Sequence, residues 1–137
     1  MSLDSSKKVL RLVGILTMFG GILAILGGAL ANFAGWSTSV PDVQQGEILI
    51  TGGIIEMISG AINTFEGYAS YAAGKRGKLT GFALIFATLA FVGSVLSILS
   101  VFLKGEKDML NIVSNALAAV LNLIVFTAAN KVRKAAR

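Results

Sequence analysis

The sequence contains no cysteine and no histidine. Without cysteine the chain forms no disulfide, and without either residue it lacks the thiolate and imidazole ligands that hold zinc and haem. The same absence excludes nucleophiles activated in Ser-His or Cys-His pairs. We therefore expect a protein that is not an enzyme, with no catalytic residue, no metal site and no cofactor.

Charge and proline are also scarce. Lys, Arg, Asp and Glu make up 14% of the 137 residues, against about 25% in an ordinary soluble domain, and there is one proline. Hydrophobic residues reach 55%, and the mean hydropathy is +0.79. The 12 basic and 7 acidic side chains are too few to cover a soluble domain of this length. The composition thus predicts an integral membrane protein in contact with the lipid bilayer.

Four apolar segments are long enough to span a bilayer, which takes about 20 residues. They cover approximately residues 12–34, 48–73, 79–103 and 109–129. Lipid leaves no partner for unpaired backbone groups, so each segment is expected to be a helix. Short connections make neighbouring helices antiparallel, and Pro41-Asp42 fits a turn before the second helix. We predict an all-α fold: a single domain over 1–137 with four transmembrane helices in an up-down bundle.

The start of the chain also resembles a signal peptide, with basic residues, an apolar run and the sequence ALA at 29–31. Its apolar run is longer than that of a usual signal peptide. We expect this segment to be kept as the first span.

Basic residues are distributed unequally between the two ends of these spans. Two, Lys104 and Lys107, fall on one side, and ten fall on the other: Lys7, Lys8, Arg11, Lys75, Arg76, Lys78, Lys131, Arg133, Lys134 and Arg137. The side rich in Lys and Arg is normally cytoplasmic. We expect both termini in the cytoplasm, and the compact chain favours a bacterial plasma membrane. Topology explains the basic pI of 9.8 better than nucleic-acid binding does; recognition of anionic lipid is the alternative.

Small residues recur at alternating steps of three and four in the first span. They are Gly14, Thr17, Gly21, Ala24, Gly28, Ala31 and Gly35. The second span repeats the pattern 39 residues later with Gly53, Glu56, Gly60, Asn63, Gly67, Ser70 and Gly74. Small residues allow the close backbone approach that holds helices together in lipid. We predict a packing seam through Gly14, Gly21, Gly28, Gly53, Gly60 and Gly67; the repeat arises either by duplication or by chance in glycine-rich helices.

The second span carries polar residues that are costly in lipid, where a carboxylate costs roughly 2.5–3.5 kcal/mol. Glu56 and Asn115 share one depth, and Asn63 and Asn122 another, each within about 3 Å at 1.5 Å per residue. We predict these two polar pairings, with Thr17 near the second. Glu66 is turned roughly 80° off the seam and faces either a neighbouring helix or cytoplasmic water.

Two functions fit this pattern. The first is a small non-enzymatic membrane protein that acts through helix association, either with itself as a homo-oligomer or as a subunit of a membrane complex. The second is a proton- or cation-coupled transporter or channel with Glu56, Asn63 and Asn115 at its site. The small size and tight seam favour the first.

Overall fold

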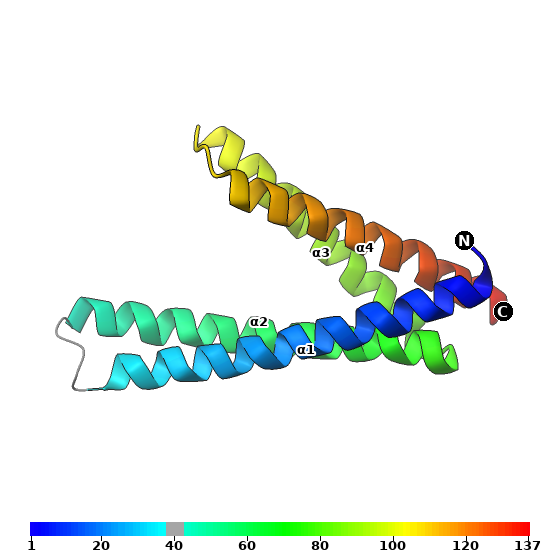
Figure 1. The fold of residues 1–137 in the computed structure, drawn as a ribbon, viewed down its shortest axis with the longest axis horizontal. Coiled ribbons are helices and arrows are strands. Elements are labelled where there is room, and N and C mark those ends of the chain that lie inside the picture. Colours follow the sequence, from blue (N-terminus) through cyan, green and yellow to red (C-terminus); the bar gives the residue numbers. More distant parts are fainter. Residues whose placement is uncertain (38–42) are drawn as a thin grey trace. The chain divides into compact units, whose positions relative to one another are not determined.

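The protein is all-helical (Figure 1). A computed structural model describes residues 1–37 and 43–137. The helices are α1 (Leu3–Trp36), α2 (Val43–Arg76), α3 (Thr80–Leu103) and α4 (Met109–Ala135). Each is long and apolar enough to cross a membrane, so the prediction of four long apolar helices is confirmed. The turn predicted at Pro41-Asp42 lies outside the described residues.

Three of the helices extend beyond the apolar segments that predicted them. α1 begins at Leu3, α2 begins at Val43 and α4 continues to Ala135. Glu47, expected in a connection, consequently lies in α2. The polar flanks contain Lys, Arg, Gln and Glu, which are good helix formers, so the helices continue past their apolar parts.

The short connections are fixed by particular backbone conformations. Gly77 follows α2 with a φ of 66°, and its N–H donates to the Ala73 carbonyl at 3.1 Å. Leu79, before α3, also adopts a left-handed φ of 59°. Asp108 caps α4, since its carboxylate accepts a hydrogen bond from the backbone N–H of Asn111 at 3.0 Å. These residues set the ends of the two turns.

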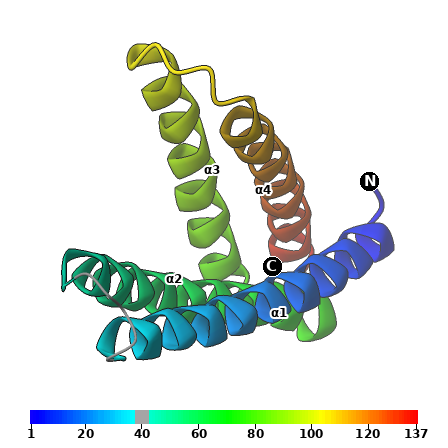
Figure 2. The same ribbon diagram turned by 60° about the vertical axis from the view of Figure 1, so that its left-hand side comes forward.

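The chain divides into two compact units, which we describe separately. The first contains residues 1–13 and 69–137, and the second contains residues 14–68. In the first unit α3 and α4 lie side by side, as both ribbon views show (Figures 1 and 2). The up-down bundle and single domain predicted for all four helices join both units and stay predictions.

The first unit has a buried core made of small and branched apolar side chains. It consists of Leu10, Ala73, Ala83, Leu84, Ala87, Val125, Ala128, Ala129 and Val132. All four helices contribute to it, which brings the start of α1, the end of α2, the start of α3 and the end of α4 together. Lys131 reinforces this junction, since its ammonium donates a hydrogen bond to the Met1 carbonyl.

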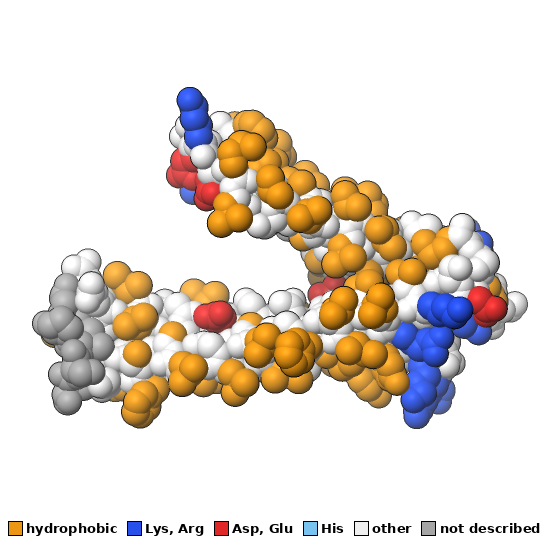
Figure 3. All heavy atoms as spheres, in the orientation of Figure 1, with side chains coloured by type: hydrophobic (Ala, Val, Ile, Leu, Met, Phe, Trp, Pro, Cys, Tyr) orange, Lys and Arg blue, Asp and Glu red, His pale blue; other side chains and the backbone are white. Residues whose placement is uncertain are grey.

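Outside this core, large apolar side chains cover the helices (Figure 3). Phe33 is 76% exposed, Leu30 71% and Leu110 78%, although such residues belong in the interior of a soluble domain. Several hydroxyl and amide groups on the helices are paired internally. Thr64, Thr88 and Thr127 each donate to the carbonyl four residues earlier, at 2.8 to 2.9 Å. These hydroxyls therefore need no partner from another helix.

Candidate helix-association site

In residues 14–68, α1 and α2 approach each other through glycines. Gly21 faces Gly60, Gly28 faces Gly53, Gly35 faces Gly46 and Gly67 faces Gly14. Each step of seven residues forward along α1 is matched by seven residues backward along α2, so the helices are antiparallel with a constant register. We call this contact the glycine seam.

The seam leaves no room for a side chain at six of these positions, which are Gly21, Gly28, Gly35, Gly53, Gly60 and Gly67. A Cβ atom added to Gly28 would lie 2.5 Å from the Gly53 carbonyl oxygen, and one added to Gly53 would lie 2.5 Å from that of Gly28. Ordinary contact begins near 3.4 Å. The contact is therefore made between backbones, which glycine permits because it has no Cβ.

The structure places all six predicted seam glycines at this contact, and it adds Gly46 opposite Gly35. Gly46 was missed because it precedes the apolar segment that defined the second span. It stands seven residues before Gly53, a spacing that would have found it.

The residues beside the glycines on α2 differ in their contacts with α1. On α2, Met57 and Thr64 contact α1, four residues after Gly53 and Gly60 respectively. The repeat places Glu56 and Asn63 on the same seam, three residues after these glycines, and both side chains are exposed. Residues three and four positions after a glycine both lie on its face of the helix. The position of α1 decides which of the two it contacts.

Glu56 lies at the edge of the glycine seam. A Cβ added to Gly27 of α1 would lie 3.4 Å from the Oε1 oxygen of Glu56. The Glu56 carboxylate therefore lies next to a residue of α1 that has no side chain. Thr17, the residue of α1 that corresponds to Glu56 in the 39-residue repeat, is half-buried.

Beside the seam, α2 carries a second line of small and polar residues at steps of three and four. We call it the polar face, and it comprises Gly52, Glu56, Ser59, Asn63 and Glu66. The first four are exposed and Glu66 is half-buried. The equivalent line on α1 contains Gly20 and Gly27, and a Cβ added to Gly20 or Gly52 would meet nothing within 4 Å. This face is thus polar and, apart from the edge where Glu56 meets Gly27, lies outside the α1–α2 contact.

The two asparagines predicted to pair with α2 lie on α4, in the other unit. The Asn115 amide donates to the carbonyl and to the side-chain oxygen of Asn111, both at 3.0 Å. Asn122 donates to the Ala118 carbonyl at 2.8 Å. The pairings of Glu56 with Asn115 and of Asn63 with Asn122 join the two units and stay predictions.

The side chains at this site can form hydrogen bonds with a partner. Glu56 offers an acceptor, Asn63 a donor and an acceptor, and Gly20 and Gly52 offer exposed backbone for close helix contact. Across residues 1–37 and 43–137, no group of three acidic side chains is placed to hold a metal ion. No protein-family model, curated protein or solved structure matches the chain.

Proposed function

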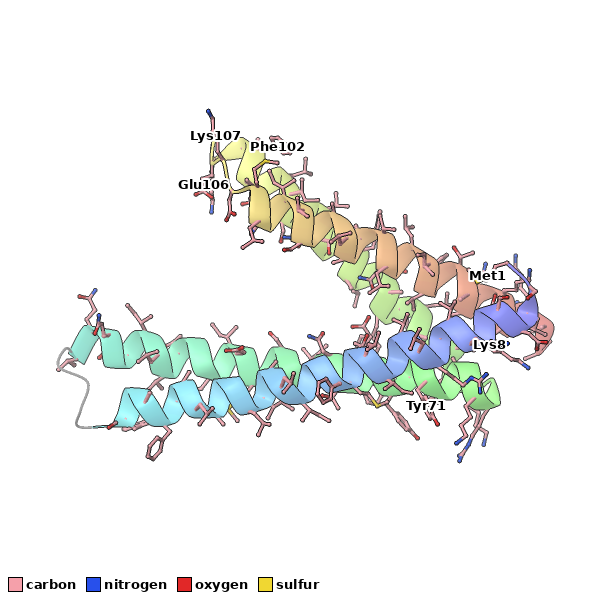
Figure 4. All side chains as sticks on the ribbon, in the orientation of Figure 1. Met1, Lys8, Tyr71, Phe102, Glu106 and Lys107 are labelled. Carbon is pink, nitrogen blue, oxygen red and sulfur yellow. The ribbon has the colours of Figure 1, made fainter. Side chains whose placement is uncertain are left out.

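We propose that this chain is a four-span protein of a bacterial plasma membrane with both termini in the cytoplasm. Ten of the 12 basic residues lie at the start of α1, at the end of α2 and its connection to α3, or at the end of α4. The buried core joins those segments. Figure 4 displays Met1 and Lys8 at this end of the first unit and Glu106 and Lys107 at the opposite end, by the α3–α4 turn. An up-down threading with the basic end inside accounts for this arrangement.

We further propose that the protein acts through helix association, with the polar face of α2 as its contact surface. The observation that carries this proposal is the exposure of Glu56 and Asn63 beside a seam that α1 already fills. A carboxylate at the centre of a spanning helix costs roughly 2.5–3.5 kcal/mol when lipid surrounds it. A second copy, or a helix of a larger membrane complex, would give both side chains hydrogen-bond partners.

Ser59 and Ala61 allow a matched test. Both are exposed on α2, and they are two positions apart, so they lie at nearly the same depth on opposite sides of the helix. Ser59→Phe should reduce the mass of the assembled protein in lipid nanodiscs, because the ring keeps a partner helix away from the polar face. Ala61→Phe should leave the mass unchanged.

The mass and the thermal stability are measured together, because they separate the possible occupants. Equal masses for wild type and both variants would refute association between chains through the polar face. If α3 and α4 of the same chain covered the polar face, Ser59→Phe would lower the melting temperature and leave the mass unchanged.

A proton- or cation-coupled transporter is the second candidate, favoured by the exposure of the Glu56 carboxylate at the edge of the seam. Asn63, two helical turns further along α2, would add a second polar side chain to its site. Glu56→Gln keeps the shape and removes the titrating group, so it should abolish pH-dependent flux in proteoliposomes. Wild-type vesicles without flux across a broad range of ions would dismiss this candidate.

A further inference from the structure

A groove of about 390 Å³ lies between α3 and α4 in the first unit. It is lined mainly by Leu84, Ile85, Leu89, Phe126, Asn130 and Arg133. These residues come from the first part of α3 and the last part of α4, the end of the unit where most basic residues lie.

The α3 side of the groove is apolar. Leu84 and Ile85 lie in one turn and Leu89 in the next, and Leu89 stands nine residues into α3, about 14 Å from its start at 1.5 Å per residue. Thr88 also lines the groove, but its hydroxyl donates to the Leu84 carbonyl at 2.8 Å. The wall therefore suits a hydrocarbon chain running along the helix.

The α4 side changes from apolar to polar towards the end of the helix. Phe126, Asn130 and Arg133 follow one another at steps of four and three, so they share one face. Arg133 is exposed and Asn130 is half-buried. A guanidinium binds phosphate through two parallel hydrogen bonds, and an amide supplies a further donor.

We propose that this groove binds one anionic phospholipid, with its phosphate against Arg133 and Asn130 and one acyl chain along Leu84, Ile85 and Leu89. The proposal rests on the membrane insertion proposed above. Charge complementarity favours an anionic lipid: residues 1–13, 69–80 and 125–137 contain ten basic side chains and the single acid Asp4. Basic pockets between spanning helices on the cytoplasmic side bind such head groups.

A specific site must be distinguished from general attraction between a basic surface and anionic lipid. Each Lys or Arg near a membrane surface strengthens that attraction by about fivefold, whatever its exact position. Lys134 provides the control, since it is exposed, adjacent to Arg133 and absent from the groove lining. General attraction predicts equal losses for Arg133→Gln and Lys134→Gln, and the groove predicts unequal ones.

The measurement is native mass spectrometry of the whole protein, released from micelles containing phosphatidylglycerol or phosphatidylcholine. We expect a phosphatidylglycerol adduct on the wild type, reduced at least tenfold by Arg133→Gln and no more than fivefold by Lys134→Gln. Equal reductions, or equal retention of both lipids by the wild type, would overturn the proposal.

A second pair of variants tests the acyl-chain wall. Leu89→Ser should weaken retention of long-chain phosphatidylglycerol and leave a short-chain analogue unaffected. Leu96→Ser is the control, because Leu96 is exposed on α3 seven residues further along and does not line the groove. Equal behaviour of the two variants would remove the acyl chain from the groove. The assembly test at Ser59 uses another helix face, so either proposal can fail without the other.

Discussion

Gly20 and Gly21 are adjacent residues of α1 that should respond oppositely to the same substitution. A Cβ added to Gly21 would lie 2.6 Å from the Gly60 carbonyl oxygen and 2.5 Å from the Thr64 hydroxyl oxygen, whereas one added to Gly20 meets nothing within 4 Å. Both residues are inside the helix, so replacement by alanine gives each the same gain in helix propensity. The difference between the two variants therefore isolates the contact across the seam.

The expected size follows from these distances. Glycine to alanine inside a helix contributes about 1 kcal/mol of stability, and Gly20→Ala should show up to that gain. At Gly21 the new methyl group would stand roughly 0.8 Å inside ordinary contact with a backbone oxygen that cannot rotate away. Overpacking of this kind costs about 1–3 kcal/mol. Gly21→Ala should thus be less stable than Gly20→Ala by about that amount.

The free energy of unfolding is measured by titrating sodium dodecyl sulfate into mixed micelles and following helix content by circular dichroism. Gly52→Ala and Gly53→Ala form an equivalent pair on α2, where a Cβ meets nothing at Gly52 and lies 2.5 Å from the Gly28 carbonyl oxygen at Gly53. Equal stability of Gly20→Ala and Gly21→Ala would refute the backbone contact described for the seam.

Three further predictions concern the connections and the topology. Gly77→Ala should lower stability by about 1–2 kcal/mol in the same titration, because a φ of 66° strains any residue with a Cβ, whereas Gly81→Ala in α3 should not destabilise. Asp108→Ala should cost about 1 kcal/mol by removing the cap of α4, and Asp108→Asn should retain most of that stability; equal losses would exclude capping. Because the chain has no cysteine, a thiol introduced by Ser2→Cys or Glu106→Cys is the sole label site. An impermeant maleimide applied to intact cells should label Glu106→Cys alone, and the reverse result would invert the proposed topology.

The helices were predictable from sequence because length and apolar content alone determine which segments can cross a bilayer. The residues at which the helices begin and end were harder to predict. α1 starts at Leu3 because helix-forming polar residues continue it beyond the apolar run, and hydropathy carries no information on that extension. Leu79 in a left-handed conformation has no signal in its own side chain, since such positions usually carry glycine.

For the candidate site, the spacing of the glycines can be read from one helix at a time, but the side chains that meet α1 cannot. Glu56 and Met57 follow Gly53 by three and four residues, so they lie on opposite sides of it at similar angles around the helix. The side that meets α1 depends on how the two backbones cross, which is a property of the pair of helices. A pattern read from a single helix therefore indicates which face packs, but it does not determine which side chain beside the glycines meets the partner helix.

The regular spacing of the seam has a consequence for how the α1–α2 hairpin is assembled. Shifting α2 by seven residues, about 10.5 Å, would again set glycine against glycine, with Gly21 opposite Gly53 and Gly28 opposite Gly46. Four residues after three of the seam glycines of α2 stand larger side chains that each pack against a glycine of α1: Ile50, Met57 and Thr64. The glycines by themselves thus permit several registers with a similar distance between the two backbones. A variant in which α2 is held in a different register should therefore move Glu56 along α1 in steps of two helical turns.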